Sequence, residues 1–172
     1  ILTLLASACC MAAEPIDTHM IDSFERADAL EAWELRDTMN GAVVTQHATD
    51  GDHALRLDYP KWEEGKQQWP AAILDVGAGL FPADWSAWGA LAFDVYCEAE
   101  APTQLKIHLR DSAGENHQTA RMLQPGKSSS FEVDVTQLPG AMDPTDMSQV
   151  HLYMTRPPNA ATLYVDNVRL EA

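Results

Sequence analysis

Tyr164-Val165-Asp166-Asn167-Val168-Arg169-Leu170, close to the end of the chain, is the stretch that decides the fold. It begins as an alternating strand, but its last apolar residues, Val168 and Leu170, fall on the opposite parity. A strand that changes parity in this way contains a β-bulge, and a bulge re-aims side chains. The re-aimed side chains here are Asp166 and Asn167. Because both carry hard oxygen ligands, Asp166 is a candidate structural metal ligand.

The rest of the chain repeats the strand pattern far more often than a helical one. Apolar and polar residues alternate with period two, and turn signals such as Asp50-Gly51-Asp52 and Pro139-Gly140 separate the runs. About ten strands at this spacing predict an all-β fold, an antiparallel β-sandwich in which two sheets bury their apolar faces against each other. The clearest alternating runs are residues 54–59, 91–97, 105–110, 131–135 and 150–155.

The first residues read as a targeting segment rather than as part of the fold. Residues 1–13, ILTLLASACCMAA, are apolar or small, carry no charge and precede Glu14-Pro15. This is typical of the end of a secretory signal peptide, and the segment is too short to span a bilayer. We therefore predict a signal-peptide remnant at 1–13, one domain at 14–172 and a secreted or periplasmic protein. Lipid anchoring through Cys9 is the alternative.

Length and charge narrow the class of protein and of partner. The chain has 172 residues, 46% of them hydrophobic, which suits one single-core domain. Its formal net charge of −15 disfavours nucleic acid and anionic membrane surfaces, and it favours neutral ligands, cations or solubility alone. We expect a monomer with no nucleic-acid partner and no membrane span. Once Cys9 and Cys10 are removed, Cys97 is alone, which excludes an internal disulfide.

No enzyme signature stands out. There is no nucleophile elbow, His-Glu-x-x-His motif or phosphate loop, and the six His residues lack ligand spacing. Asp94, Glu132 and Asp134 lie in regular strand patterns, where an outward-facing polar position explains them. A non-catalytic domain is therefore predicted, either a binding module or a structural and protein-interaction domain.

Segments in a fixed order resemble a known group of proteins. They are similar to the galactose-binding-domain-like β-sandwiches, and most of all to family 11 carbohydrate-binding modules and to the N-terminal domains of bacterial glycoside hydrolases. The segments are residues 21–25 with Trp33, then 49–57, then 84–86 leading into 91–96, then 149–154, and finally 163–170.

The resemblance implies a jelly roll with a structural calcium on its convex side and a sugar chain on its concave side. The positions that match the calcium ligands of such domains are Glu25, Asp50 and Asp52 of the Asp-Gly-Asp turn, and Asp166. Calcium needs several hard oxygen ligands, which these residues carry. The alternative is that Glu25 and Asp166 cap strands or pair with Arg169.

The polar faces of several strands are expected to form the sugar-binding surface. Sugars need hydrogen-bonding groups for their hydroxyls and aromatic rings for their C–H faces. The expected ligand is a neutral glycan, for which a β-glucan is one candidate. An ordinary solvated sheet face remains the alternative. The residues expected to line this surface are Trp62, Trp69, Asp94, Tyr96, Lys106, His108, Arg110, His151 and Tyr153.

Overall fold

A computed structural model describes residues 17–76 and 79–172, and the predicted signal-peptide remnant lies outside them. The described chain forms two antiparallel sheets and two short 3-10 helices, η1 (Ala29–Ala32) and η2 (Val135–Gln137). The predicted all-β antiparallel sandwich is therefore confirmed. Within residues 17–76 and 79–172, no helix is long and apolar enough to cross a membrane.

The first sheet has six strands and is built around the last strand of the chain. β11 lies between β4 and β6 and also pairs with β1, while β3 and β9 form the outer edges. The strands are β1 (Thr18–Asp22), β3 (Asn40–Val44), β4 (Ala54–Tyr59), β6 (Ala90–Ala99), β9 (Lys127–Asp134) and β11 (Ala161–Glu171).

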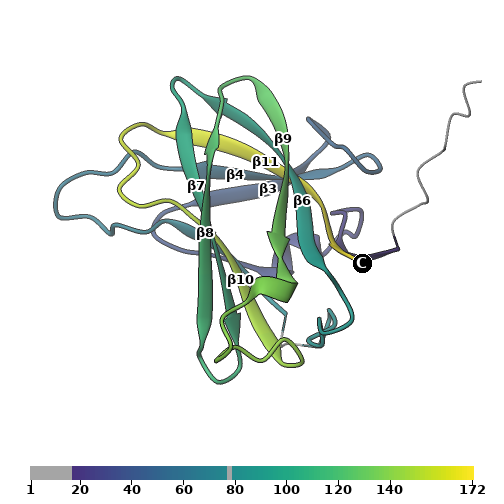
Figure 1. Ribbon diagram of the computed structural model, residues 1–172. Helices are drawn as coiled ribbons and strands as arrows, with labels where there is room; N and C mark the ends of the chain where they lie inside the picture. The colour runs from purple at the N-terminus through teal and green to yellow at the C-terminus, as the bar shows by residue number, and fades with distance from the viewer. Residues whose placement is uncertain (1–16, 77–78) are drawn as a thin grey trace, which may run out of the picture.

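The second sheet has five strands in the order β2-β5-β10-β7-β8. In the view of Figure 1, β7 and β8 cross in front of β3, β4 and β11, and the connection between β4 and β5 projects at the left. The strands are β2 (Trp33–Leu35), β5 (Ala71–Asp75), β7 (Thr103–Asp111), β8 (Asn116–Leu123) and β10 (Met147–Tyr153).

The two sheets share one apolar core. Alternate residues of each strand point into it, and Trp85, which precedes β6, is fully buried among them. The Tyr59 hydroxyl crosses from β4 and donates to the Leu152 carbonyl of β10 at 2.8 Å. Burial raises the pKa of this hydroxyl far above its usual value, so it stays a donor. Cys97 is buried in the same core, as its strand parity indicates.

The bulge predicted in the closing strand is confirmed. β11 pairs with β6 in register up to Asp166 opposite Asp94, and pairing resumes with Arg169 opposite Ala92, so β11 has one extra residue. Asn167 lies within the bulge and has a φ of 54°, a left-handed conformation that Asn tolerates better than most residues. The bulge returns Val168 and Leu170 to the core side.

Asp166, the last residue before the bulge, directs its carboxylate at the connection between β3 and β4. Its Oδ2 accepts hydrogen bonds from the backbone N–H groups of Thr49 and Asp50, the latter at 2.8 Å, and its Oδ1 accepts from Asn167 N. Asp166 is only 1% exposed. A buried charge requires such partners, and here backbone donors provide them.

Replacing Asp166 by Ala should lower the free energy of unfolding by roughly 2 to 3 kcal/mol. The substitution removes charge-assisted hydrogen bonds and leaves N–H groups of the turn without their acceptor. Urea titration in a chelating buffer measures the change. The matched control is Asp52→Ala, whose exposed side chain lies in the same turn and should change the free energy by less than about 0.5 kcal/mol. Equal effects of the two substitutions would contradict this role for Asp166.

Candidate functional site

The outer face of the five-stranded sheet carries a row of side chains that crosses every strand. The register aligns, from one edge to the other, Glu34 of β2, Ile73 of β5, His151 of β10, His108 of β7 and Gln118 of β8. Side chains at paired positions point to the same face of a sheet. The row therefore places two imidazoles at the centre, an amide at one end and a carboxylate at the other.

A second row lies beside the first and completes a groove of about 710 Å³. Ala71, Tyr153 and Lys106 are paired across three strands in this row. The small Ala71 and the buried Ile73 form a low apolar floor, and Trp69 stands at the rim with 54% of its surface exposed. An exposed indole beside a polar groove is a typical contact for a ligand with an apolar face.

Hydrogen bonds hold the polar side chains of the groove in place. Tyr153 donates its hydroxyl to Gln118 Oε1 at 3.0 Å, and Lys106 Nζ donates to Thr155 Oγ1 at 3.0 Å. The Lys106 ammonium also lies 5.8 Å from the centre of the Tyr153 ring, in reach of a cation–π contact. These contacts preorganise the groove, which lowers the entropic cost of binding.

The two histidines are uncharged near neutral pH. Their rings lie 4.8 Å apart. Burial lowers the pKa of His151 to about 4, with further lowering by His108, Arg36 and Arg110. Burial, followed by the charge of Arg110, also lowers the pKa of His108. Neutral imidazoles offer both a donor and an acceptor to hydroxyl groups.

His108 has hydrogen-bonding capacity to spare. Its Nε2 is buried and has no partner within the described part of the chain, whereas His151 Nε2 is 3.0 Å from Gln149 Oε1. A buried polar atom without a partner is uncommon and costs about 1–3 kcal/mol. A ligand hydroxyl that displaced a covering side chain and reached His108 Nε2 would relieve that cost.

The structure brings together five of the residues predicted for the sugar face. Trp69, Lys106, His108, His151 and Tyr153 all line the groove.

Arg110 and Trp62 lie outside the groove. Arg110 is one step further along β7 on the same face. The Trp62 backbone N–H donates to the Pro157 carbonyl, and its ring packs against Arg156, whose guanidinium is 5.0 Å from the ring centre.

The prediction that Asp94 and Tyr96 share this face is wrong. Both lie on β6, in the six-stranded sheet, and face away from the groove. Asp94 Oδ2 accepts hydrogen bonds from Thr49 Oγ1 and from Asn167 Nδ2 at 2.9 and 3.0 Å. Tyr96 is covered by the stacked ring of His47, with a centroid distance of 3.6 Å. Strand alternation shows which residues share a face but not which sheet a strand joins.

The predicted metal residues converge on one turn. Glu25 Oε1 accepts from the backbone N–H groups of Asp52 and His53 at 2.8 and 2.7 Å, while Asp166 holds the other end of the turn. His53 Nδ1 lies 2.8 Å from Glu25 Oε2, and hydrogen bonding from His53, followed by the turn N–H groups, lowers the pKa of Glu25. Asp50 and Asp52 contribute N–H groups here, not side-chain oxygens.

Carboxylate oxygens such as those of Glu25 and Asp166 suit calcium, but in this turn they accept hydrogen bonds from backbone N–H groups. Calcium takes six to eight oxygen ligands, and the oxygens of Glu25 and Asp166 already accept N–H groups. Across residues 17–76 and 79–172, no three His, Cys, Asp or Glu side chains are grouped so as to hold a metal ion.

Sequence reasoning missed several groove residues. Gln118 lies on β8, whose sequence NHQTARML lacks the alternation that marked the other strands. Arg36 and Asp37 follow the three-residue β2, and Gln67 lies in the connection between β4 and β5. Only the paired edge strands and the folded loops bring these residues to the groove, so no local pattern in the sequence indicates them.

The chain resembles known proteins in its structure but not in its sequence. No protein-family model matches the chain, and neither does any curated protein sequence. Solved structures do match, and agarases are among them. An exo-β-agarase superimposes with a TM-score of 0.73 at 16% identity over 88% of this chain, and a second agarase with 0.70 at 17% identity over 90%. The chain spans about a quarter of each agarase, 24% in both cases.

A complete binding module also matches. The family 11 carbohydrate-binding module from Clostridium thermocellum, solved with a β-1,3-1,4-mixed-linked tetrasaccharide, has a TM-score of 0.67 at 13% identity. The match covers 91% of this chain and 96% of the module. The chain thus has the β-sandwich fold of carbohydrate-binding modules and of a domain found in agarases.

Stability should fall as the pH drops from about 6.5 toward 4, in part through His151. Its folded pKa of about 4 lies below the ordinary value of 6.5, so the unfolded chain binds the proton first. The stability contribution of neutral His151 is complete above pH 6.5 and is lost as the pH approaches 4. Urea unfolding at pH 7 and pH 5 should show a smaller loss for His151→Gln than for the parent protein. Equal losses would contradict this assignment.

Proposed function

We propose that this chain is a non-catalytic carbohydrate-binding module that holds a neutral glycan in the groove of the five-stranded sheet. The observation that carries the proposal is the composition of the groove. An exposed Trp69 stands beside two uncharged imidazoles and the fixed hydroxyl of Tyr153, above the apolar floor of Ala71 and Ile73. This is the mixture that a sugar chain requires.

Each part of the groove would contact a different part of a pyranose ring. The C–H face of a sugar would pack on the Trp69 indole, because aromatic rings bury apolar area at little entropic cost. Sugar hydroxyls would meet His108 Nε2, the Gln118 amide and Lys106 Nζ, which together offer donors and acceptors.

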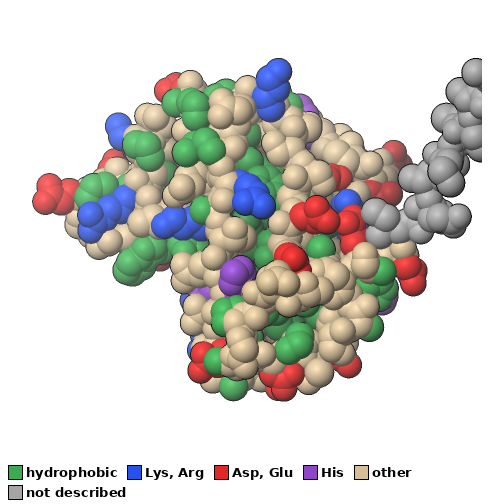
Figure 2. All heavy atoms as spheres, in the orientation of Figure 1, with side chains coloured by type: hydrophobic (Ala, Val, Ile, Leu, Met, Phe, Trp, Pro, Cys, Tyr) green, Lys and Arg blue, Asp and Glu red, His purple; other side chains and the backbone are tan. Residues whose placement is uncertain are grey.

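Electrostatics favours an uncharged ligand. The net charge of −15 repels polyanions such as acidic glycans and nucleic acids. Arg36, Asp37 and Lys106 line the groove, and Arg36 is paired with Glu34 beside it, so neither sign dominates. On the face shown in Figure 2, Lys and Arg side chains are separated by uncharged surface, with no continuous basic area.

The solved structures support two classes of glycan. The family 11 module binds a mixed-linked β-glucan tetrasaccharide, and the two other proteins are agarases. We propose a β-linked neutral polysaccharide, with a β-glucan first and an agarose chain second. Since the chain spans only a quarter of the agarases, a role as the accessory domain of a larger glycoside hydrolase is the second candidate function.

Binding should depend on Trp69 and Tyr153. We expect Trp69→Ala and Tyr153→Ala each to weaken the affinity for the preferred glycan by about tenfold or more, since a buried aromatic contact contributes about 1–3 kcal/mol. Isothermal titration against mixed-linked β-glucan, agarose and xylan oligosaccharides measures the change. The control is Met20→Ala, an exposed apolar residue on the other sheet. If the parent protein binds none of these glycans, the proposed function is wrong.

Calcium at Glu25, Asp50, Asp52 and Asp166 is a separate proposal. A cation at this turn would neutralise several carboxylates of a strongly acidic protein, at the expense of some N–H hydrogen bonds. Millimolar calcium should then raise the melting temperature of the parent protein over its value in chelator. Glu25→Gln should remove this increase without changing the preferred glycan. Identical melting curves with calcium and with chelator would rule out the ion.

A further inference from the structure

A second cavity lies beside the groove, under the projecting connection of residues 60–70. Its volume of about 290 Å³ is close to the lower end of the range for small-molecule sites, roughly 300 to 1,000 Å³. We call it the loop pocket. Asp37 and Thr38, in the turn after β2, form one wall, and residues 60–70 with Pro157 form the others.

The loop pocket continues the groove. Asp37 and Gln67 line both cavities. β2 is the edge strand of the five-stranded sheet, so a ligand that crosses the strands from Gln118 reaches Asp37 at the edge. The loop pocket is the next hollow along that path.

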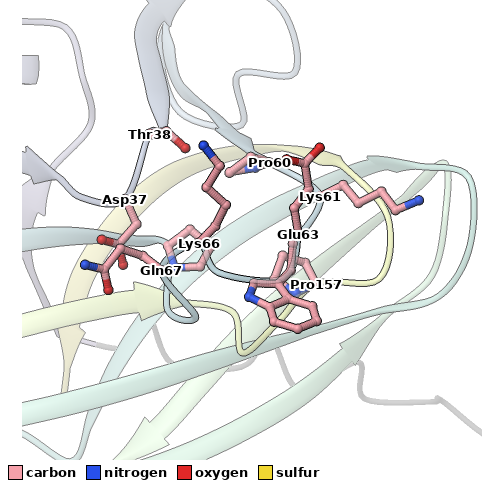
Figure 3. Close-up of a pocket in the computed structure, with 10 residues that line it drawn as sticks. Asp37, Thr38, Pro60, Lys61, Glu63, Lys66, Gln67 and Pro157 are labelled. Carbon is pink, nitrogen blue, oxygen red and sulfur yellow. The ribbon is translucent and has the colours of Figure 1, made fainter.

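The lining of the loop pocket is balanced in charge. Lys61 and Lys66 carry two positive charges, and Asp37 and Glu63 carry two negative ones. In Figure 3, Asp37 and Gln67 lie on one side and Lys61 and Glu63 on the other, with Lys66 extending between them toward Thr38. Several donors and acceptors with no excess of either sign suit a neutral, polyhydroxylated ligand better than an ion.

The apolar part of the loop pocket contains an unused donor. Three prolines and Trp62 complete the lining. The Trp62 indole N–H is buried and has no acceptor within residues 17–76 and 79–172, which costs about 1–3 kcal/mol. One face of the ring is engaged by Arg156. A ligand hydroxyl that displaced one of the flexible lining side chains would supply the missing acceptor.

The wall of the loop pocket is strained. Asp37 and Thr38 have φ values of 59° and 65°, two consecutive left-handed residues, and a β-branched side chain such as that of Thr rarely adopts this conformation. Flanking hydrogen bonds hold the turn, from Arg36 N to the Ala71 carbonyl and from Met39 N to the Arg36 carbonyl. Strain of this kind persists only where the surrounding structure enforces it, and it is more frequent at binding sites than elsewhere.

We propose that the loop pocket is a subsite for one further sugar residue of the glycan held in the groove. This inference rests on the proposed function and makes it more specific, because it extends the recognised ligand past the edge strand β2. The extra residue would exchange hydrogen bonds with Asp37 and Gln67 where the two cavities meet, and with the Trp62 N–H inside the loop pocket.

A plug in the loop pocket tests the subsite. Lys66→Trp and Glu63→Trp each place an indole at an exposed residue that lines the loop pocket but not the groove. The control is Glu64→Trp, an exposed residue in the same loop that lines neither cavity. The probes are mixed-linked β-glucan and agarose oligosaccharides of three to six residues, titrated calorimetrically, with melting curves to verify folding.

The parent protein and Glu64→Trp should gain about tenfold in affinity at the step in length that reaches the loop pocket. Both plugged variants should lose that gain and still bind the shorter oligosaccharides as the parent does. If the parent binds oligosaccharides and the plugged variants keep its dependence on length, the subsite is overturned while the groove stands. Failure of the parent to bind any oligosaccharide would overturn the proposed function, and this inference with it.

Discussion

The hydrogen bonds between the Asp166 carboxylate and the turn at Thr49 and Asp50 are the contacts on which the rest of the sandwich depends, because they tie the last strand to the connection between β3 and β4. Asp166 is the last residue of β11 that stays in register with β6, and the extra residue that follows it returns Val168 to the core. Glu25 holds the other end of the turn through N–H groups. Segments from the start and the end of the domain are thus joined over one turn.

The turn covers the outer face of the six-stranded sheet around Asp166, whereas the outer face of the five-stranded sheet carries the groove. The contrast is clear in how the polar groups are used. Asp94 and Tyr96 are engaged by Asn167 and His47, whereas the groove keeps His108 Nε2 without a partner. An unsatisfied buried nitrogen costs stability, so its retention in the groove is easier to explain by binding than by folding.

Local patterns in the sequence were sufficient for the fold class and for the parity of the clearly alternating strands, but not for β8. The bulge was visible because Val168 breaks the alternation, and His108 and His151 could be placed on polar faces. Assignment of strands to sheets depends on tertiary pairing, which alternation does not encode, so Asp94 was grouped with the wrong sheet. Trp62 and Trp69 lie in the same loop, yet the Trp62 ring packs against Arg156 while Trp69 lines the groove, a difference that only tertiary contacts reveal.

The difference between the strand pattern, which is local, and the loop contacts, which are tertiary, explains how the fold persists at 13 to 17% identity to the agarases and the family 11 module. A sandwich needs apolar residues at alternate positions, and many sequences satisfy that requirement. The groove floor comes from regular strands, but its rim and the loop pocket come from the turn at Asp37 and from residues 60–70. Connections tolerate change more readily than paired strands. If the proposed function holds, the choice of glycan should therefore reside in these two connections, while the sheet provides a common platform.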